Sequence, residues 1–409
     1  MPEPTGLDDR LAAGRTRLLA TIDQPPLARI GRRAATLRRR RRAAVAAGAL
    51  VAVLATGVPA TEPWWGPSPT PPPVADTLPA GGPIYTGAGI TINGLVDIKS
   101  VTDLPGTIAD VAFIDADHGY LVTACDRATD CRPAFASTTD GGLTWRHRPA
   151  PMARDASPDL ITFPDGSVAL VTGRAGIVSS DGGQTWTETP GSATTSAQRA
   201  GRDEVLRAFG DQAGCVGGRV DVWSRQHGFR GTLVNQPGMG VCRVSPAAGA
   251  DGVWWVGGTA GSQAAVATTR DGGQHWEQHV LPGMGAARVT TMGSHAYAVV
   301  TGVGKDDLRE IYHSIAGGPF VAVPDRGGRP AEVAGEPIAL LDGRLVIAAG
   351  GRWYVSSDDG ASFTLAEGNL PWVGRLARTA TGYVAYNLFN QGWAAFSADG
   401  ATWRKFPVR

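Results

Sequence analysis

The sequence predicts an all-β fold of seven small antiparallel sheets, each of about four strands, behind a single N-terminal transmembrane helix. Three observations lead to this expectation: a short turn motif that recurs at regular spacing, apolar alternation between its copies, and an unusual composition. Of 409 residues, 56 are glycine, and only 18% are charged. This composition suits many short strands joined by tight turns better than it suits a helical protein.

The recurring motif combines a hydroxyl residue, an aspartate, glycines and an aromatic ring, as in "SSDGGQTW" from Ser179 to Trp186. Its other copies are "TTDGGLTW", "TTRDGGQHW", "SSDDGASF" and the shorter "SADGATW". A catalytic loop is normally used once, so repetition favours a structural turn. The motif residues are Thr138, Asp140, Gly142, Trp145, Ser179, Asp181, Gly183, Trp186, Thr269, Asp271, Gly273, Trp276, Ser356, Asp358, Gly360, Phe363, Ser397, Asp399, Gly400 and Trp403.

The spacing of the motif gives the number of units. Successive aspartates of the motif are 41, 90, 87 and 41 residues apart, so one copy is missing from each of the two long gaps. "HSIAGGPF", His313 to Phe320, lies where one is expected but has Ala316 at the carboxylate position. The other gap centres near "SRQHGFRG", Ser224 to Gly231, where the motif is unrecognisable. We therefore expect seven units of about 41–45 residues, a period typical of a β-propeller.

Alternating apolar residues between turn signals predict about four short strands in each unit. The motif falls between the third and fourth strands, where it must reverse the chain. The aspartate can accept hydrogen bonds from backbone N–H groups, the glycines supply positive φ, and the hydroxyl adds a local hydrogen bond. The aromatic ring begins the outer strand and can be buried against a neighbouring sheet. Each residue of the motif therefore has a structural role.

These motifs resemble the Asp-box, or bacterial neuraminidase, repeat, and the resemblance covers Asp110 to Arg409. The unit spacing is most similar to that of photosystem II assembly-factor-like and related exported propellers, while sialidases and some glycoside hydrolases share the same boxes. The resemblance implies a β-propeller fold and says little about function. The chain departs from the pattern in the third and fifth units, which lack the carboxylate.

The N-terminus predicts a membrane anchor. Residues 1–42 form a basic arm with eleven arginines and four acids, and the uncharged run 43–60 is just long enough to span a bilayer. Arginines on the N-terminal flank place the arm in the cytoplasm. Residues 61–83, with eight prolines, form a semi-rigid linker to the propeller at 84–409. We expect a single-pass plasma-membrane protein with an extracytoplasmic domain; a cleaved signal peptide and secretion, or a buried helix, are the alternatives.

Four cysteines lie beyond the predicted anchor, and none forms a CxxC pair or has a histidine at zinc-ligand spacing. Outside the cytoplasm, two disulfides are the natural expectation. We favour Cys125–Cys131 and Cys215–Cys242 among three pairings, because each closes a loop within one unit or two neighbouring units. Four free, buried thiols are the alternative.

A carbohydrate-active hydrolase is the alternative to a binding protein. The sialidase resemblance implies an arginine triad, a Tyr–Glu nucleophile pair and an aspartate acid/base, but its Arg-Ile-Pro-type motif is absent. Arg127 and Arg132 are the only arginines just before the first box, and His275 and His279 are interpreted as surface residues. We predict no catalytic residue, cofactor, metal or nucleic-acid partner. The arginines that could converge from several blades are Arg219, Arg288, Arg352 and Arg375.

The favoured interpretation is a non-catalytic scaffold that binds a protein or a glycan on one propeller face. Candidate ligand contacts are the tryptophans outside the boxes, Trp254, Trp255, Trp372 and Trp393, although each is also a candidate core residue. Trp254 and Trp255 are adjacent, so they should face opposite sides of a strand. An arginine cluster with a Tyr–Glu pair in the central channel would favour the enzyme, and a channel of small or apolar residues the scaffold.

Overall fold

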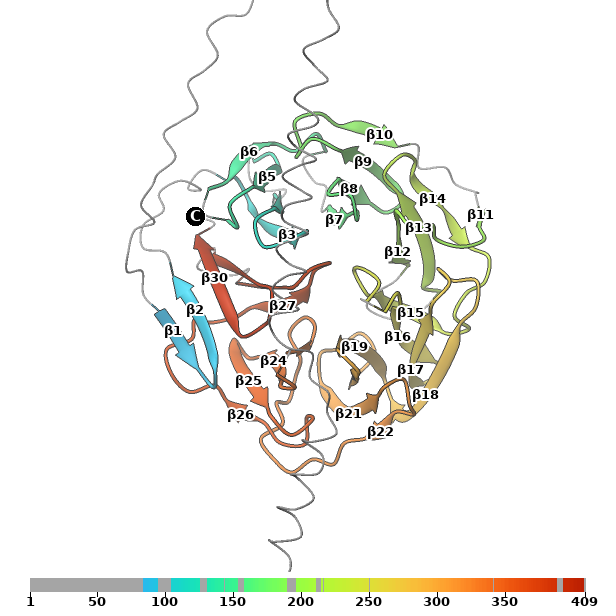
Figure 1. The fold of residues 1–409 in the computed structure, drawn as a ribbon, viewed down its shortest axis with the longest axis vertical. Helices are drawn as coiled ribbons and strands as arrows, with labels where there is room; N and C mark the ends of the chain where they lie inside the picture. Colours follow the sequence, from blue (N-terminus) through green and yellow to red (C-terminus); the bar gives the residue numbers. More distant parts are fainter. Residues whose placement is uncertain are drawn as a thin grey trace, which may run out of the picture. The chain divides into compact units, whose positions relative to one another are not determined.

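The predicted seven-bladed, all-β architecture is confirmed by a computed structural model, in which seven sheets surround a central axis (Figure 1). The model describes residues 84–94, 104–125, 131–142, 144–153, 158–189, 196–210, 215, 217–249, 251–340, 342–387 and 393–407. No helix within these ranges is long and apolar enough to cross a bilayer. The basic arm, the predicted span at 43–60 and the linker lie outside the described residues.

Five blades are four-stranded antiparallel sheets whose strands follow one another along the chain. Blade 1 contains β3 (Thr107–Phe113), β4 (Gly119–Ala124), β5 (Ala134–Thr138) and β6 (Arg146–Pro149), and blade 2 contains β7 (Asp159–Thr162), β8 (Val168–Thr172), β9 (Ala175–Ser179) and β10 (Thr187–Thr189). Blade 4 contains β15 (Gly240–Val244), β16 (Trp254–Ala260), β17 (Gln263–Thr269) and β18 (Glu277–Met284). Blade 5 contains β19 (Ala286–Met292), β20 (His295–Thr301), β21 (Leu308–Ile315) and β22 (Val321–Ala322), and blade 6 contains β23 (Ile338–Ala339), β24 (Leu345–Ala349), β25 (Arg352–Ser356) and β26 (Thr364–Leu365).

Blade 3 is built differently, and this explains its missing box. Its strands are β12 (Glu204–Phe209), β13 (Arg219–Ser224), β14 (Gly228–Leu233) and an outer strand β11 (Ser196–Ala197), which precedes the others in the chain. Strand β11 pairs parallel to β14, so no hairpin connects a third strand to a fourth. The stretch from Ser224 to Gly231 lies at the β13–β14 connection instead. The expectation of a degenerate box there is therefore wrong.

Blade 7 joins the two ends of the propeller. It contains β27 (Arg375–Arg378), β28 (Tyr383–Asn387), β29 (Trp393–Ser397) and β30 (Thr402–Pro407), and the hairpin of β1 (Ile84–Gly87) and β2 (Ile90–Gly94) extends its outer edge. Strand β2 pairs parallel to β30, and its Ile90 and Ile92 are fully buried. Phe113 of blade 1 stacks on Phe396 of blade 7 at 4.3 Å between ring centroids. The ring is therefore closed by contacts between segments far apart in sequence.

The boxes form turns that satisfy their own polar groups. In the four full-length copies, the aspartate Oδ1 accepts a hydrogen bond of 2.8–3.0 Å from the backbone N–H four residues later. The Ser or Thr hydroxyl donates to the same Oδ1 and accepts from the second glycine's N–H. The Thr185 hydroxyl, followed by the Thr185 N–H, holds the pKa of Asp181 well below its ordinary value. In the degenerate fifth copy, Ala316 adopts φ +52° in the β21–β22 turn.

The second glycine of each box allows close packing between blades. A Cβ at Gly183 would lie 2.2 Å from the Phe135 ring of blade 1, and one at Gly273 would lie 2.3 Å from Leu233 of blade 3. The closing aromatic side chains at Trp145, Phe363 and Trp403 are buried. The box therefore reverses the chain and also supports the joint with the preceding blade.

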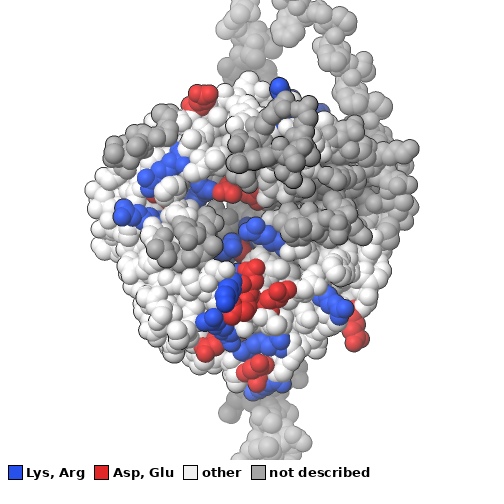
Figure 2. Space-filling view, turned by 180° about the vertical axis from the view of Figure 1, so that it is seen from behind, with Lys and Arg blue, Asp and Glu red and all other residues white. Residues whose placement is uncertain are grey.

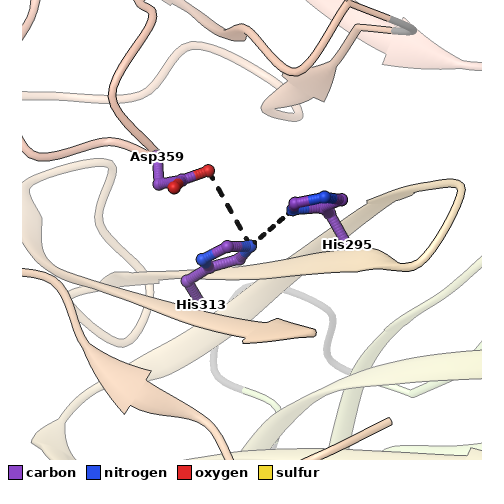
Figure 3. A group of neighbouring side chains, drawn as sticks. All are labelled: His295, His313 and Asp359. Carbon is purple, nitrogen blue, oxygen red and sulfur yellow. Dashed lines mark hydrogen bonds and ion pairs between the residues drawn. The ribbon is translucent and has the colours of Figure 1, made fainter. Parts of the chain in front are cut away.

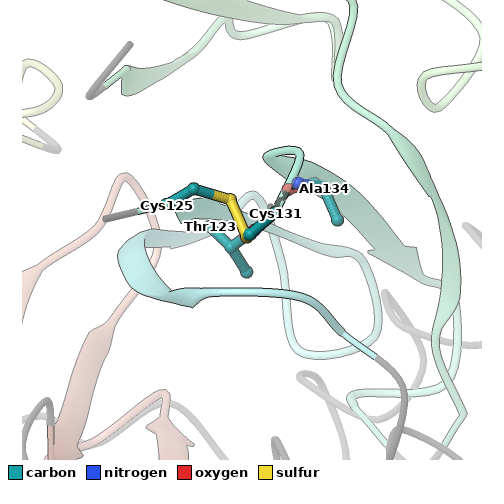
Figure 4. The surroundings of a disulfide bond; sticks show 4 residues. All are labelled: Thr123, Cys125, Cys131 and Ala134. Atoms are coloured by element: carbon teal, nitrogen blue, oxygen red, sulfur yellow. Dashed lines mark hydrogen bonds between the residues drawn. A yellow bond between two sulfur atoms is a disulfide. The ribbon is translucent and has the colours of Figure 1, made fainter. Parts of the chain in front are cut away.

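Both favoured disulfides are present among the described residues. Cys125–Cys131 closes the β4–β5 connection of blade 1, where the Thr123 hydroxyl also accepts a hydrogen bond from the Ala134 N–H at 2.8 Å (Figure 4). Cys215–Cys242 links the loop before β13 to β15 and so joins blades 3 and 4. A cross-link of either loop length contributes about 2–4 kcal/mol in the chain-entropy model.

Candidate binding site in the central channel

A small cavity of about 190 Å³, here called the channel cavity, lies inside the ring. Its walls come from β3, β7, β12, β15 and β27, each the innermost strand of its blade, and from the segment before β23. Charged side chains from four blades reach it. They are Asp110, Arg207, Arg243, Glu336 and Arg378.

Two larger hollows continue the channel cavity to the surface. The first, here called the mouth, has a volume of about 910 Å³ and shares Thr162, Val205, Pro246 and Ala380 with the channel cavity. The second, here called the rim groove, has a volume of about 1040 Å³. Asp165 and several residues of the 199–204 segment line both the rim groove and the mouth. Because neighbouring hollows share wall residues, the three adjoin one another, from the connecting loops of blades 2 and 3 to the innermost strands of the ring.

Most charges of the channel cavity are paired between blades. Arg207 of blade 3 forms an ion pair with Asp159 of blade 2. Arg243 of blade 4 lies 3.5 Å from Glu336, whose other oxygen accepts a hydrogen bond from the Arg378 N–H at 3.1 Å. The first pair joins neighbouring blades and the second joins blade 4 to the segment before blade 6, and together they leave the cavity walls strongly polar.

Asp110 differs from the box aspartates because one of its hydrogen-bond partners comes from another blade. Its two oxygens accept hydrogen bonds from the N–H of Val111 at 2.8 Å and of Leu160, on β7, at 3.0 Å. Burial raises the pKa of Asp110 to about 6, and the negative charge of Asp159 adds to this effect. Arg375 opposes it. A carboxyl group with such a pKa titrates close to neutral pH.

Arg375 and Tyr386 are neighbours of Asp110 in blade 7. Burial raises the pKa of Tyr386 to about 12, while the positive charge of Arg375 opposes the shift. The buried Nε of Arg375 has no hydrogen-bond partner among the described residues. Arg375 lies behind the wall of the channel cavity and does not line it.

The rim groove presents two exposed arginines, Arg199 and Arg202, that have no acidic partner among the residues the model describes. Two other arginines in its wall are neutralised, Arg225 by Asp165 at 2.8 Å and Arg230 by Glu204. On the face opposite to that of Figure 1, charges of both signs are interspersed around the middle (Figure 2). The hollow therefore suits a polar, charged ligand rather than an apolar one.

The structure brings together only part of the predicted arginine set. Arg288 and Arg375 lie on the innermost strands β19 and β27, whereas Arg219 and Arg352 are exposed at the starts of β13 and β25. Arg288 is buried and donates to the carbonyls of Val333 and Gly335, in addition to an ion pair with Asp306. It therefore fixes the entry to blade 6.

The four candidate tryptophans lie in different environments. Trp254 and Trp393 are buried, although an edge of Trp254 lines the mouth. Trp255 faces the other side of β16, is half-buried and packs edge-on against Phe320 of blade 5 at 6.4 Å. Trp254 is buried and Trp255 only half-buried, because neighbouring blades cover most of both faces of a blade. Trp372 is 66% exposed and does not line any of the three hollows.

Arg207, Arg243, Glu336 and Arg378 were not singled out by the sequence. Each lies in or beside the innermost strand of a unit, where the motif spacing could have drawn attention to charged residues. Glutamates are scarce in this domain, so a glutamate just before an innermost strand, such as Glu336, could have indicated a residue of the channel. The pairing between blades could not be inferred, because it depends on the strand order around the ring.

The fold and the hollow define a seven-bladed propeller of the BNR-repeat type with a polar depression that enters its centre. Residues 97–213 match the family described as photosynthesis system II assembly factor YCF48. The expected resemblance to such assembly factors is therefore confirmed. No curated protein is a significant match to the chain.

Solved structures with a similar fold include proteins of different activity. YCF48 bound to D1 peptide is 20% identical with a TM-score of 0.34, and the match covers 74% of this chain and 83% of that one. YCF48 from Cyanidioschyzon merolae is 13% identical with a TM-score of 0.44, covering 74% and 96%. A streptogramin B lyase is 13% identical with a TM-score of 0.47, covering 74% and 94%. At these identities the likeness concerns the fold alone.

Proposed function

We propose that this chain is a membrane-anchored, extracytoplasmic propeller that binds a segment of another protein without catalysing a reaction. The observation that carries the proposal is that the rim groove, the mouth and the channel cavity adjoin one another and share wall residues. A hollow that runs from the rim into the ring accommodates an extended chain, whereas a compact substrate would need only one of its parts. The family match over residues 97–213, to assembly factors, points in the same direction.

The charges of the hollow indicate the kind of segment. Arg199 and Arg202 stand exposed in the rim groove, without an acidic partner among the described residues. Arginine forms strong charge-assisted hydrogen bonds with carboxylates. We therefore expect an extended segment with acidic side chains or a terminal carboxylate, with its other polar groups paired to the mixed charges of the wall.

The membrane attachment and the location are part of the same proposal. The eleven arginines before an uncharged run of bilayer length favour an anchor with a cytoplasmic N-terminus. Two disulfides are typical of a domain outside the cytoplasm. Protease protection in spheroplasts tests this part, since only an extracytoplasmic propeller would be digested in intact spheroplasts.

Selection of peptides tests the binding function. The full chain would be used to select from a library of random displayed peptides, and the affinity of the enriched peptides would then be measured by fluorescence anisotropy. We expect Asp- and Glu-rich peptides to be enriched, and the double variant Arg199→Glu/Arg202→Glu to weaken their binding about tenfold or more. Arg352→Glu, an exposed reversal on β25, is the matched control. Failure to enrich any peptide, or equal loss in the control, would contradict the proposal.

A hydrolase remains the second candidate because of one observation. Burial raises the pKa of Asp110 to about 6, and a second carboxylate, Asp159, lies near it; glycosidases use a pair of neighbouring carboxyl groups. Against this, both Asp110 oxygens already accept backbone hydrogen bonds, and Asp159 is paired with Arg207. Both groups are thus engaged in holding strands together.

The sialidase form of this candidate has some of its residue types in the channel. Arg243, Arg375, Glu336 and Tyr386 gather there, which is nearer to the enzyme expectation than a small or apolar lining would be. However, Glu336 accepts from Arg243 and from the Arg378 N–H, and a Tyr386 phenol with a pKa of about 12 is a poor nucleophile. Hydrolysis of a fluorogenic sialoside or aryl glycoside that disappears in Asp110→Asn or Tyr386→Phe would favour the hydrolase over the scaffold.

A further inference from the structure

Three side chains with metal-ligating atoms face one another at the joint between blades 5 and 6, outside the hollow described above (Figure 3). His295 begins β20, His313 lies on β21, and Asp359 lies in the box turn after β25. His295 Nδ1 is 2.9 Å from His313 Nε2, which is 3.9 Å from Asp359 Oδ1. The three atoms lie within 4.8 Å of one another.

The strand register explains why the histidines meet. His313 is directly opposite Tyr297 in the antiparallel pair of β20 and β21, and His295 precedes Tyr297 by two residues. Side chains at directly opposite positions and at alternate positions share one face of a sheet. Both imidazoles therefore project from the same face of blade 5, toward the box turn of blade 6.

Asp359 is held in place from two sides. The buried Tyr297 donates a hydrogen bond of 2.7 Å from its hydroxyl to Asp359 Oδ1. Asp359 also occupies the position that is glycine in three other boxes, Gly141, Gly182 and Gly272. It adopts φ +59°, close to the +70° and +71° of those glycines. A carboxylate thus stands where the turn would be less strained with glycine, and its side chain points to the histidines.

The residue types are also unusual for their place in the repeat. The residue just before the box hydroxyl is Ser137, Val178, Thr268, Val355 or Phe396 in the other boxed blades, and His313 takes this place in blade 5. Packing between blades is satisfied by any of those five residues. The corresponding turns of three other boxes likewise form with glycine, and not a carboxylate, at the position of Asp359. Both unusual residues, His313 and Asp359, lie at the same joint between blades, and packing or turn formation does not explain them.

We propose that His295, His313 and Asp359 bind one divalent transition-metal ion, with Zn²⁺ the preferred candidate, which links blade 5 to blade 6. Two imidazoles and one carboxylate are a common donor set for zinc with a fourth position for water or a ligand. Ligands about 2.1 Å from the ion in a tetrahedron are about 3.4 Å apart, so the observed separations need only small side-chain rotations.

The surroundings allow an ion to enter. The side chain of His313 is 11% exposed and that of Asp359 is 50% exposed, so one side of the group faces solvent. The Tyr297 hydroxyl would act as the partner that orients the carboxylate ligand.

Titration of the chelator-treated full chain with Zn²⁺ by calorimetry tests the proposal, with Co²⁺ absorption to report the ligand geometry. We expect one Zn²⁺ per chain and a Co²⁺ spectrum of tetrahedral intensity. His313→Gln and Asp359→Gly should each weaken binding about 10-fold or more, and Tyr297→Phe should weaken it less. His275→Gln is the matched control, since His275 also faces a box carboxylate, Asp271, at 2.6 Å but has no second histidine.

The outcomes separate the metal site from a purely structural cluster. Asp359→Gly restores the residue of the sister turns, so its melting temperature without metal should equal or exceed that of the parent chain. Upon addition of Zn²⁺ the parent chain should gain several degrees and Asp359→Gly should gain none. The proposal is overturned if the parent chain binds no stoichiometric Zn²⁺, or if Asp359→Gly and His313→Gln bind it as tightly as the parent. It is also overturned if His275→Gln loses binding equally.

Discussion

Two aspartates, Asp358 in a rim turn and Asp110 in the channel, accept backbone hydrogen bonds but have opposite electrostatics. In the rim turn, the Ser362 N–H donates to Asp358 at 2.8 Å, and this bond leads the interactions that hold its pKa below the ordinary value. In the channel, burial outweighs the bonds to Asp110 and raises its pKa to about 6. The charged form of aspartate is thus stabilised in the rim turn and destabilised in the channel.

The difference follows from where the partners come from. Every described hydrogen-bond partner of the Asp358 carboxylate lies within four residues of it. Each box therefore satisfies its aspartate locally, and the same turn can form in every blade that has the motif. Asp110 depends on Leu160 of blade 2 and on charges of blades 2 and 7, so its environment exists only once the ring has closed. Repetition therefore marks residues that make the fold, and unrepeated charges at the centre mark residues available for function.

The largest effect is expected where a box meets its neighbouring blade. At Gly273, φ is +94° and a Cβ would lie 2.3 Å from the buried Leu233. Gly273→Ala should therefore lower the free energy of unfolding by about 2–4 kcal/mol, from backbone strain and overpacking together. Denaturant titration measures this change.

Gly182→Ala is the control for Gly273→Ala, because Gly182 has φ +71° but no atom within 4 Å of its Cβ position. It should lose only about 1 kcal/mol, from strain alone. Equal losses in the two variants would show that the box acts through the turn by itself and that the joint between blades contributes nothing.

An intermediate effect is expected from the pH dependence of Asp110. Its pKa is raised from 3.8 to about 6 in the folded chain, so the folded state binds the proton more tightly than the unfolded state does. Stability should therefore fall as the pH rises from about 4 to about 6, by at most about 3 kcal/mol. The lowered pKa of Asp358 has the opposite sign, and its contribution is lost as the pH falls below about 4.

Asp110→Asn should remove the loss of stability between pH 4 and 6 and leave the acid limb below pH 4 unchanged. Unfolding free energies measured across this range provide the test. If the unfolding free energy of the variant falls just as steeply between pH 4 and 6, then Asp110 is not the group that titrates there. The proposed difference in pKa between the rim aspartates and Asp110 would then be wrong.

Much of the fold could be predicted because its information is local. Box residues such as Asp181 and Thr185 lie four positions apart, so the motif alone indicates the turn, and the motif period indicates the number of blades. The short loops of the two disulfides were inferred in the same way. The third blade was expected, but the origin of its outer strand was not, because β11 reaches the outer edge from upstream and no local pattern signals a strand that pairs parallel to β14.

The candidate site could be predicted only in part, because it is assembled from distant segments. Arg288 and Arg375 were singled out as arginines able to converge, but nothing in the sequence separated them from Arg219 and Arg352, which remain exposed. The metal group was missed for the same reason. His295 and His313 are eighteen residues apart, and their meeting depends on the register of one hairpin. Their carboxylate partner comes from the next blade.

The smallest effect, and the finest test of the rim turn, concerns a single hydroxyl. The Ser362 hydroxyl donates a hydrogen bond to Asp358 Oδ2 at 2.7 Å, whereas the Ser362 backbone N–H donates to Asp358 Oδ1. Ser362→Ala removes only the first bond and should cost about 0.5–1 kcal/mol, since water can replace it at this partly buried position. The pKa of Asp358, followed by NMR, should move up toward its ordinary value without reaching it, because the backbone bond persists. A pKa that does not move would mean that the backbone alone determines the electrostatics of the rim, and a pKa that rises above the ordinary value would make the rim resemble the channel.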